Sequence, residues 1–417
     1  MSNKAIVVGG GIVGLSSAFY LQQAGWQVTV IDRGDFTNNC SYGNAGYVCP
    51  SHFVPLASPG IIKQGLRWML NPESPFYIQP RLDWGLISWG LKFIRSATPA
   101  NLERNAEPLR DIALLSKKLY EEWNALPGFS FAYAQKGLLE YFQTAEKEAH
   151  AAHTVEDSLK LGLEARLLSA DEVQAMEPQV KLNVRGALYF GCDAHLHPNL
   201  LMQQMLRYLQ QSGVAFLPNA EVDAFERSGN KITAVKAGKH WEQADVVVIA
   251  TGSWSRAVAA QVGAKLPLVG GRGYSMVFKN AELPLNHPAV LMEGRVALTP
   301  FDERQTRLGG TMEITSLNAP PRPSRVAGIV KAARQYFPEA VLDIPPMEQV
   351  WFGYRPCSAD GMPYIGRTRK YSNCIVATGH AMVGLSLGAG TGRLVAELAT
   401  DQPSSVDLTP YDIHRFD

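Results

Sequence analysis

The hydrophobic positions near both ends of the chain follow the pattern of a parallel sheet with helices between its strands. An apolar run at residues 5–8 precedes a helical pattern at 13–24, and a second apolar run follows at 28–31. Toward the other end, an apolar run at 373–377 precedes a helical pattern that reaches Leu398. Strands that alternate with helices are typical of βαβ units, in which the strands lie parallel. The two ends of the chain are therefore expected to build one domain.

The middle of the chain shows mixed patterns that predict a second domain. Residues 108–126 have helical periodicity, while 137–142 and 271–312 alternate as strands do. One apolar run, 244–250, is like the terminal strands instead. Because no repeat and no long linker separates these parts, the two domains are expected to interweave. The expected boundaries are 1–60, 165–265 and 345–417 for the first domain, and 61–164 and 266–344 for the second.

One stretch of the second domain, 83–94, carries an apolar stripe at helical spacing beside basic residues. The stripe and its basic neighbours are Trp84, Ile87, Leu91 and Ile94, and Arg81, Lys92 and Arg95. Apolar stripes on helices usually face a protein core, so we expect this one to be buried. The alternative is a helix that lies on a membrane surface, because tryptophan and cationic side chains favour that interface.

Charge and cysteine content argue against several classes of protein. The 417 residues contain 39 Lys and Arg against 38 Asp and Glu, which gives no electrostatic reason to expect a nucleic-acid partner. The five cysteines form no CxxC pair, and His195-x-His197 has no acidic or thiol partners at ligand spacing, so no metal site is expected. The run at 5–8 leaves no room for a signal peptide, and no apolar run is long enough for a membrane span. A cytoplasmic location is expected.

Three glycines between the first strand and the first helix match the fingerprint of a dinucleotide site. Gly9, Gly11 and Gly14 form a Gly-x-Gly-x-x-Gly motif, and Asp32 ends the second strand about twenty residues downstream. The first glycine permits a tight turn, the second lets the backbone approach a pyrophosphate, and the third lets helix and strand pack closely. The helix N-terminus faces the phosphates, and the acid accepts hydrogen bonds from the ribose. The acid disfavours NADP, whereas the motif leaves NAD and FAD open.

Further segments are similar, in the same order along nearly the whole chain, to one family of flavoproteins. They are residues 41–46 (Ser-Tyr-Gly-Asn-Ala-Gly), 250–255 (Ala-Thr-Gly-Ser-Trp-Ser), 353–356 (Gly-Tyr-Arg-Pro), 360–366 (Asp-Gly-Met-Pro-Tyr-Ile-Gly) and 377–380 (Ala-Thr-Gly-His). With the N-terminal fingerprint they resemble the D-amino-acid oxidase superfamily, above all its bacterial D-amino acid dehydrogenases. The resemblance implies an α/β fold, in which a Rossmann-type FAD-binding domain interweaves with a substrate domain of mixed β-sheet and helices.

The resemblance also implies a noncovalently bound FAD, since no cysteine lies in the stretch 379–392, where sarcosine-oxidase relatives attach their flavin. Small residues at 41–46 would run beside the flavin, and the backbone of Val222 would contact the adenine. Residues 384–388 would begin the last helix, whose N–H groups could stabilise negative charge on the reduced flavin. The residues expected to bind FAD are Gly9, Gly11, Ile12, Val13, Gly14, Asp32, Arg33, Ser41, Asn44, Ala45, Gly46, Val48, Val222, Thr251, Gly252, Trp254, Gly384, Leu385, Ser386 and Leu387.

Arg355 is the residue that the resemblance places against the substrate carboxylate. A guanidinium holds both oxygens of a carboxylate in one plane and so orients the Cα hydrogen toward the flavin. Tyr274, His380 and His52 are expected to supply neighbouring hydrogen bonds. The alternative for Arg355 is a structural contact with a neighbouring acid or with the flavin itself. The chain departs from glycine oxidases at 381–384, where no second arginine follows Gly-His, and this leaves the substrate open.

The expected reaction is the oxidation of the Cα–N bond of a D-amino acid to the imine or 2-oxo acid. A flavin itself accepts the hydride, so the reaction does not require a paired general acid and base. D-Proline and cis-4-hydroxy-D-proline are specific options. A quinone-type molecule is the expected electron acceptor, and contact with the inner face of the cell membrane is an option. Two alternatives stay open: an amine oxidase for glycine or sarcosine, and a noncatalytic FAD-binding assembly partner.

Overall fold

A six-stranded sheet joins the two ends of the chain in the computed structural model, which describes residues 3–69, 71–279, 282–301 and 305–417. Its strand order is β19-β20-β13-β1-β2-β9. All pairs in it are parallel except β19 with β20. The strands are β1 (Lys4–Val8), β2 (Gln27–Ile31), β9 (Ala215–Leu217), β13 (Val246–Ile249), β19 (Tyr364–Arg367) and β20 (Cys374–Thr378). The four predicted strands of this domain are confirmed, with small shifts at their ends.

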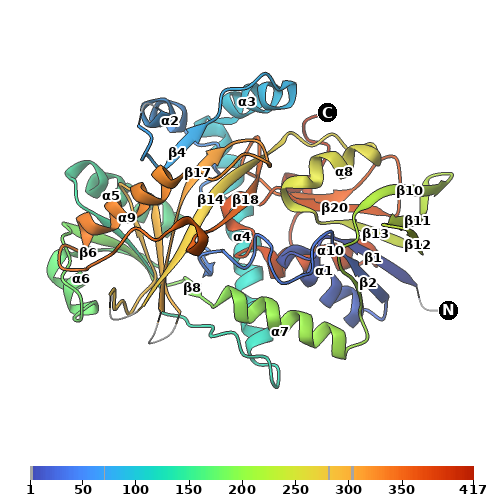
Figure 1. Cartoon of the computed structure of the whole chain (residues 1–417), viewed down its shortest axis with the longest axis horizontal. Helices are drawn as coiled ribbons and strands as arrows, with labels where there is room; N and C mark the ends of the chain where they lie inside the picture. Colours follow the sequence, from blue (N-terminus) through green and yellow to red (C-terminus); the bar gives the residue numbers. More distant parts are fainter. Residues whose placement is uncertain (1–2, 70, 280–281, 302–304) are drawn as a thin grey trace.

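Both faces of this sheet are covered, as its continuous apolar strands require. Ala5 and Val7 pack toward helices, while Ile6 and Val8 pack toward the opposite side. The helices on the first side are α1 (Ile12–Gln23), α7 (Pro198–Gln211) and α10 (Gly388–Ala399). The second side holds α8 (Ser255–Gln261) and a small antiparallel sheet of β10 (Val222–Ser228), β11 (Lys231–Ala237) and β12 (His240–Gln243). Figure 1 shows these two layers on either side of β1.

A nine-stranded mixed sheet forms the other half of the molecule (Figure 1). Its order is β18-β14-β17-β16-β15-β5-β7-β6, with β4 parallel to β17. The strands are β4 (Phe76–Ile78), β5 (Leu138–Phe142), β6 (Ala165–Ser169), β7 (Gly186–Phe190), β14 (Leu268–Lys279), β15 (Ala289–Leu291), β16 (Val296–Pro300), β17 (Gln305–Ile314) and β18 (Trp351–Ser358). The expected combination of a Rossmann-type α/β domain with a mixed sheet is confirmed.

The remaining elements surround the nine-stranded sheet or connect the two sheets. The helices are α2 (Ile61–Met69), α3 (Trp84–Ser96), α4 (Pro99–Asn124), α5 (Ala145–Lys160), α6 (Ala170–Met176) and α9 (Pro323–Tyr336). The short elements are β3 (Tyr47–Val48), β8 (Ala194–His195), η1 (Gly252–Trp254), η2 (Met347–Gln349), η3 (Ala381–Val383) and η4 (Thr409–Tyr411). No helix in the described part of the chain is both long enough and apolar enough to cross a membrane.

Three sheet strands bear on the proposed division into domains. β6, β7 and β18 fall within the ranges expected for the nucleotide-binding domain, yet they pair in the nine-stranded sheet. The strands with which a strand forms backbone hydrogen bonds decide the sheet to which it belongs. We therefore propose that the substrate-side unit contains these strands as well.

Two helices differ from the sequence expectation. α4 begins at Pro99 rather than at 108, and it contains Pro108 in its interior; Thr98 caps its first turn. The helix at 83–94 forms as α3, but burial of its stripe is wrong: Trp84 is 84% exposed and Leu91 is 53% exposed. α3 instead buries Trp89, whose indole N–H donates to the carbonyl of Cys357. Periodicity locates a helix but does not decide which of two apolar sides faces the core.

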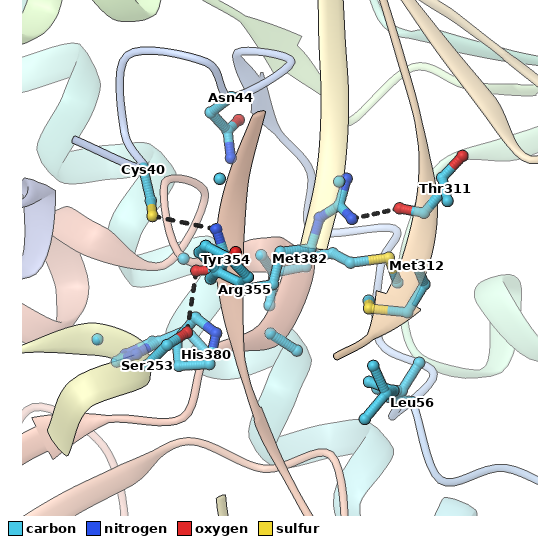
Figure 2. Close-up of a pocket in the computed structure, with 18 of the residues that line it drawn as sticks. Cys40, Asn44, Leu56, Ser253, Thr311, Met312, Tyr354, Arg355, His380 and Met382 are labelled. Carbon is cyan, nitrogen blue, oxygen red and sulfur yellow. Dashed lines mark hydrogen bonds between the residues drawn. The ribbon is translucent and has the colours of Figure 1, made fainter. Parts of the chain in front are cut away.

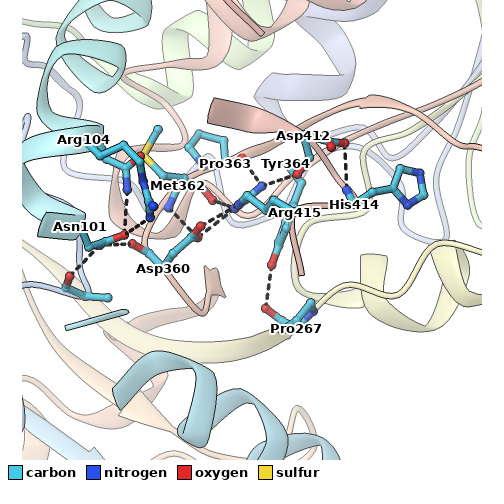
Figure 3. A network of polar contacts seen from close by, with 12 residues as sticks. Asn101, Arg104, Pro267, Asp360, Met362, Pro363, Tyr364, Asp412, His414 and Arg415 are labelled. Atoms are coloured by element: carbon cyan, nitrogen blue, oxygen red, sulfur yellow. Dashed lines mark hydrogen bonds and ion pairs between the residues drawn. The ribbon is translucent and has the colours of Figure 1, made fainter. Parts of the chain in front are cut away.

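The C-terminal segment is tied to the turn before β19 by an ion pair (Figure 3). Arg415 donates from Nε and Nη2 to the two carboxylate oxygens of Asp360, at 2.6 and 2.9 Å. The backbone N–H of Met362 donates to the same carboxylate, and the Asn101 amide donates to the Asp360 carbonyl. Bidentate pairs of this kind fix geometry as well as adding energy. The Asp360 segment, noted in the sequence as a family motif, thus joins α4, β19 and the chain end.

The contact between β1 and α1 leaves no space for a side chain at two glycines. Gly9 has φ +113°, and a Cβ there would lie 2.4 Å from the Ala250 carbonyl oxygen. A Cβ on Gly14 would lie 1.8 Å from the Gly9 carbonyl oxygen. Both distances are far shorter than a van der Waals contact, so the strand and helix can approach this closely only with glycine.

We expect Gly14→Ala to lower the free energy of unfolding by at least about 3 kcal/mol, because the added methyl group displaces backbone rather than a movable side chain. Thermal unfolding monitored by circular dichroism measures the change. Gly90→Ala is the matched control, since a Cβ at Gly90 in α3 would meet nothing within 4 Å. Equal melting temperatures for Gly14→Ala and the parent protein would contradict the close contact.

Candidate active site and cofactor cavity

A single cavity of about 1620 Å³ opens between the two sheets. This volume exceeds the roughly 300–1,000 Å³ of ordinary small-molecule pockets, so it is large enough for a dinucleotide together with a small substrate. Most of the residues predicted from the sequence line it: Gly9, Gly11, Ile12, Val13, Asp32, Arg33, Ser41, Asn44, Ala45, Val222, Thr251, Gly252, Trp254, Gly384, Leu385, Ser386, Arg355, Tyr274, His380 and His52.

The N-terminus of α1 forms one wall of the cavity. The backbone N–H of Ile12 donates to Ser41 Oγ at 2.9 Å, and the first turn of the helix contains no acidic side chain. The first N–H groups of a helix lack partners within the helix and attract anions. The sequence thus leaves the positive end of α1 free of competing carboxylates, and this end suits a pyrophosphate.

Asp32 lies at the carboxyl end of β2, beside this helix terminus. Its carboxylate accepts the N–H of Gly10 at 2.6 Å and the N–H of Gly34 at 2.7 Å. Each carboxylate oxygen has two lone pairs, so the carboxylate keeps acceptor capacity toward the cavity that it lines. These two backbone bonds hold the acid in the position that ribose recognition requires.

The segments after β2 and β13 meet at the same end of the cavity. The Arg33 guanidinium stacks 3.8 Å from the centre of the Trp254 ring. Thr251 and Ser255 share a hydrogen bond at 3.0 Å, and Gly252 turns the chain with φ +54°. The carboxyl ends of parallel strands are where α/β sheets bind nucleotides. Val222, expected beside adenine, also lines this end.

Arg307 holds the loop of small residues that follows Cys40. Its Nη1 donates to the carbonyls of Tyr42 at 2.9 Å and Asn44 at 2.6 Å, while Nη2 reaches Asn199. Burial lowers the pKa of Arg307 to about 10. Arg307 lies on β17 and does not line the cavity, so it is a positioning residue. Sequence reasoning missed it; the only available signal was an arginine inside a strand pattern.

Four residues expected to bind the cofactor lie behind the cavity wall. Gly14 packs against Gly9, and a Cβ on Gly46 would lie 2.2 Å from the Leu196 carbonyl oxygen. Val48 and Leu387 are buried and do not line the cavity. Their places support the wall, whereas direct contact with a ligand stays a prediction.

The final turn differs in detail from the expectation. α10 begins at Gly388, so Gly384–Leu387 precede the helix rather than form its first turn. Gly384, Leu385 and Ser386 nevertheless line the cavity. Ser386 Oγ accepts the N–H of Cys49 at 2.9 Å, which ties this turn to the segment after β3.

Arg355 is a half-buried cation that faces the cavity. Its Nη1 donates to the Thr311 carbonyl at 2.5 Å, as Figure 2 shows. Gly273 makes room for it, because a Cβ there would lie 2.2 Å from Arg355 Nη1. Within the described ranges no carboxylate lies at ion-pair distance from Arg355, and burial lowers its pKa. A guanidinium that faces a cavity without an acidic partner can bind an anion that enters the cavity.

The three residues expected to assist Arg355 line the cavity, and each has a polar atom that already contacts another part of the protein. Tyr274 donates its only hydroxyl proton to Glu313 at 3.0 Å and accepts the N–H of Arg322, so the expected hydrogen bond from its hydroxyl to the substrate is not supported. His380 Nε2 pairs with Thr391 Oγ1 at 2.9 Å, and burial lowers the pKa of His380 to about 3. It is therefore neutral at physiological pH. His52 Nδ1 lies 3.3 Å from Ser51 Oγ.

Thiol and imidazole groups lie near the cavity, although the sequence predicts no metal site. All five cysteines are free, and burial raises the pKa of the Cys40 and Cys49 thiols. Cys49, His52 and Asp193 place ligand-type atoms within 4.8 Å of one another, a cluster that the sequence did not indicate. Asp193 already accepts two hydrogen bonds from Ser51, at 3.1 and 2.5 Å. Each of its carboxylate oxygens therefore has a donor within the protein.

We expect Arg307→Lys to weaken binding of the expected FAD roughly tenfold, because one ammonium cannot reach both loop carbonyls and Asn199, which the guanidinium contacts through two nitrogens. Flavin fluorescence during titration of apoprotein with FAD measures the affinity. Arg325→Lys is the matched control: Arg325 is equally buried and donates to the Ser74 carbonyl at 2.8 Å, away from the cavity lining. Equal loss of FAD in both variants would attribute the effect to general destabilisation.

Comparison with known proteins identifies relatives of the same length. The chain is 32% identical over 418 residues to a D-amino acid dehydrogenase of Vibrio vulnificus (strain CMCP6), covering 98% of this chain and 99% of the relative. It is 31% identical over 407 residues to the D-amino acid dehydrogenase of Helicobacter pylori, covering 96% of each chain. Among solved structures, glycine oxidase from Geobacillus kaustophilus has a TM-score of 0.77 at 21% identity, covering 100% of this chain and 99% of the other. L-Proline dehydrogenase from P. horikoshii has a TM-score of 0.73 at 20% identity, covering 100% and 98%.

The family assignment agrees with the site. The sequence model of the family described as FAD dependent oxidoreductase matches residues 4–398, which include the glycine motif, Arg355 and most of the last helix. The cavity has the length, the helix terminus and the ribose acid that FAD needs. The resemblance seen in the sequence is confirmed, and the chain belongs to the family of FAD-dependent oxidoreductases.

Proposed function

We propose that this FAD-dependent enzyme oxidises the Cα–N bond of a D-amino acid, with D-proline and cis-4-hydroxy-D-proline as specific candidates. The observation that carries the proposal is Arg355, a half-buried cation that faces the cavity and has no acidic partner in the described part of the chain. A substrate carboxylate would neutralise it. The name shared by the relatives at about 30% identity, D-amino acid dehydrogenase, supports the same substrate class.

Arg355 would fix the substrate by its carboxylate. The Thr311 carbonyl holds one end of the guanidinium, and Gly273 leaves space beside it. The planar fork can then bind both carboxylate oxygens in one plane, which restricts rotation of the substrate about its long axis. Orientation of the Cα–H bond in this way supplies a large part of the rate enhancement when the protein itself forms no covalent bond with the substrate.

FAD, when bound, accepts the hydride from Cα. We place its pyrophosphate at the N-terminus of α1, its ribose at Asp32 and its adenine at Val222, with noncovalent binding throughout. The loop from Ser41 to Ala45 and the turn at Gly384–Leu387 would hold the flavin ring. His380 is uncharged at neutral pH, so it would contribute shape and a neutral hydrogen bond rather than positive charge.

The surface formed by α2, α3 and the segment between them supports a membrane contact, which we propose as the place where a quinone-type acceptor is met. Both helices project from the same side of the molecule (Figure 1). Leu66 is 63% exposed, Leu82 102% and Trp84 84%. Lys63, Arg67 and Arg95 supply positive charge near these side chains. Exposed apolar side chains beside basic ones are the pattern of a peripheral membrane surface.

Arg355→Ala should lower kcat/KM for the D-amino acid roughly a hundredfold, because the carboxylate loses its charged partner. This change corresponds to a loss of about 3 kcal/mol of transition-state stabilisation. Arg355→Lys should lower it less, since the charge remains without the planar fork. Rates of anaerobic flavin bleaching with a D-amino acid and with its amide test this, and the amide should lose little. Retention of full selectivity for the carboxylate over the amide in Arg355→Ala would contradict the assignment.

The same bleaching assay with a panel of substrates decides the reaction itself. D-Amino acids, including D-proline, should bleach the flavin faster than glycine or sarcosine. Fastest bleaching by sarcosine would indicate a secondary-amine oxidase, and bleaching by none of them would favour a noncatalytic role.

Trp84→Ser together with Leu91→Ser should reduce binding to vesicles of phosphatidylcholine with 30% phosphatidylglycerol by about thirtyfold, because two apolar side chains leave the lipid interface (~1 kcal/mol each). Co-sedimentation measures the bound fraction. Trp241→Ser is the control, since Trp241 is 48% exposed on β12 in the other half of the molecule. No binding by the parent protein, or unchanged binding by the double variant, would contradict the membrane surface.

A further inference from the structure

A row of residues crosses the nine-stranded sheet and ends in a carboxylate. Gly309 of β17 lies opposite Ala297 of β16, Ala297 opposite Val290 of β15, and Val290 opposite Glu140 of β5. Residues that lie directly opposite each other on neighbouring strands share one face of the sheet. All four line the cavity. The face between Gly309 and Glu140 therefore carries only small or apolar side chains, and Glu140 is the acid at its end.

The Glu140 carboxylate has no hydrogen-bond donor from the residues that the structure describes. It lies in the cavity wall, and burial raises its pKa. A carboxylate that faces a cavity with its acceptor capacity unused can serve as a recognition group for a hydrogen-bond donor that enters. Glu140 itself lines the cavity from β5, so a ligand can contact its carboxylate directly.

The charges around Glu140 indicate what kind of group it would accept. His52, Arg295 and Lys147 interact with it electrostatically and favour its ionised form, while burial and Asp193 oppose ionisation. Because these basic groups already offset its negative charge, a second full cation in the ligand gains little there. A hydroxyl suits the site better, since it can donate to a carboxylate and can also accept from a protonated carboxyl group.

The spacing suits a small substrate held at both ends. Arg355 reaches the Thr311 carbonyl on β17, and Glu140 lies three strands farther on. At about 4.8 Å per strand, these backbones are roughly 14 Å apart. The Glu140 side chain and a hydrogen bond of about 2.8 Å at each end of the substrate take up part of this distance. The remaining length fits a hydroxylated amino acid of about the size of proline.

We propose that Glu140 determines substrate specificity by hydrogen-bonding a hydroxyl on the side chain of the amino acid whose carboxylate Arg355 holds. The preferred substrate class is then a hydroxylated D-amino acid, with cis-4-hydroxy-D-proline as the ring-containing member. This inference rests on the proposed function, because it takes Arg355 as the carboxylate anchor. It adds a residue, Glu140, that the sequence did not indicate.

The test compares substrates that differ by one hydroxyl. Rates of anaerobic flavin reduction are measured by stopped flow for D-proline against cis-4-hydroxy-D-proline, and for D-2-aminobutyrate against D-homoserine. The parent holoenzyme should prefer the hydroxylated member of at least one pair by tenfold or more in kcat/KM. Glu140→Leu should abolish this preference while reducing the rate with the unhydroxylated member less than threefold, because only the hydroxyl loses its partner.

Two further variants separate recognition from loss of structure. Glu140→Gln, which keeps the shape and a hydrogen-bonding oxygen, should retain part of the preference and decides the matter if Glu140→Leu fails to retain FAD. Glu164→Leu, at an exposed acid just before β6, should leave the preference unchanged.

The outcomes distinguish this inference from the proposed function. A preference that survives in both Glu140 variants, or no preference in the parent enzyme, overturns the role of Glu140 while D-amino acid oxidation stands. Failure of every D-amino acid to reduce the flavin overturns the proposed function itself.

Discussion

The close contact of Gly14 with the Gly9 carbonyl is the constraint on which the rest of the nucleotide half depends. It brings the N-terminus of α1 to the carboxyl edge of the sheet, where β2 delivers Asp32 and β13 delivers Thr251. A helix displaced by even one methyl group would point its free N–H groups elsewhere. The phosphate site is therefore a consequence of packing, and the glycines are needed for the geometry of the backbone.

Two arginines on neighbouring strands show how function can be distinguished from structure. Arg272 on β14 is fully buried and donates to Glu313 at 2.9 and 2.6 Å, so its charge is compensated within the protein. Arg355 on the neighbouring strand β18 is half-buried and faces the cavity without an acid among the residues described. Removal of a charge from water is costly unless it is paired. The first arginine satisfies that condition in the folded chain, and the second satisfies it only with a ligand.

The exposed apolar side of α3 and the row of cavity residues that ends at Glu140 each leave a group in surroundings that do not suit it. An apolar surface in water and an unpaired carboxylate in a cavity are both unfavourable for the isolated protein. Each would become favourable with the partner that we propose for it, which is lipid for α3 and a hydroxyl donor for Glu140. Stability alone explains neither feature, and this is why both are informative about partners.

The sequence by itself determined the elements whose signal is local. Glycine spacing after an apolar run, an acid at the end of the next strand and alternating strand and helix patterns identified the nucleotide half and a dinucleotide site, because each depends on residues close together in the chain. The resemblance of further motifs to one family added FAD. Tertiary structure alone decided the rest. Arg307 meets the loop at Tyr42, Tyr274 gives its proton to Glu313, and Glu140 joins the cavity through three strand pairings. These contacts join residues far apart in sequence, and no periodicity encodes which strands pair or which side of a helix is left uncovered.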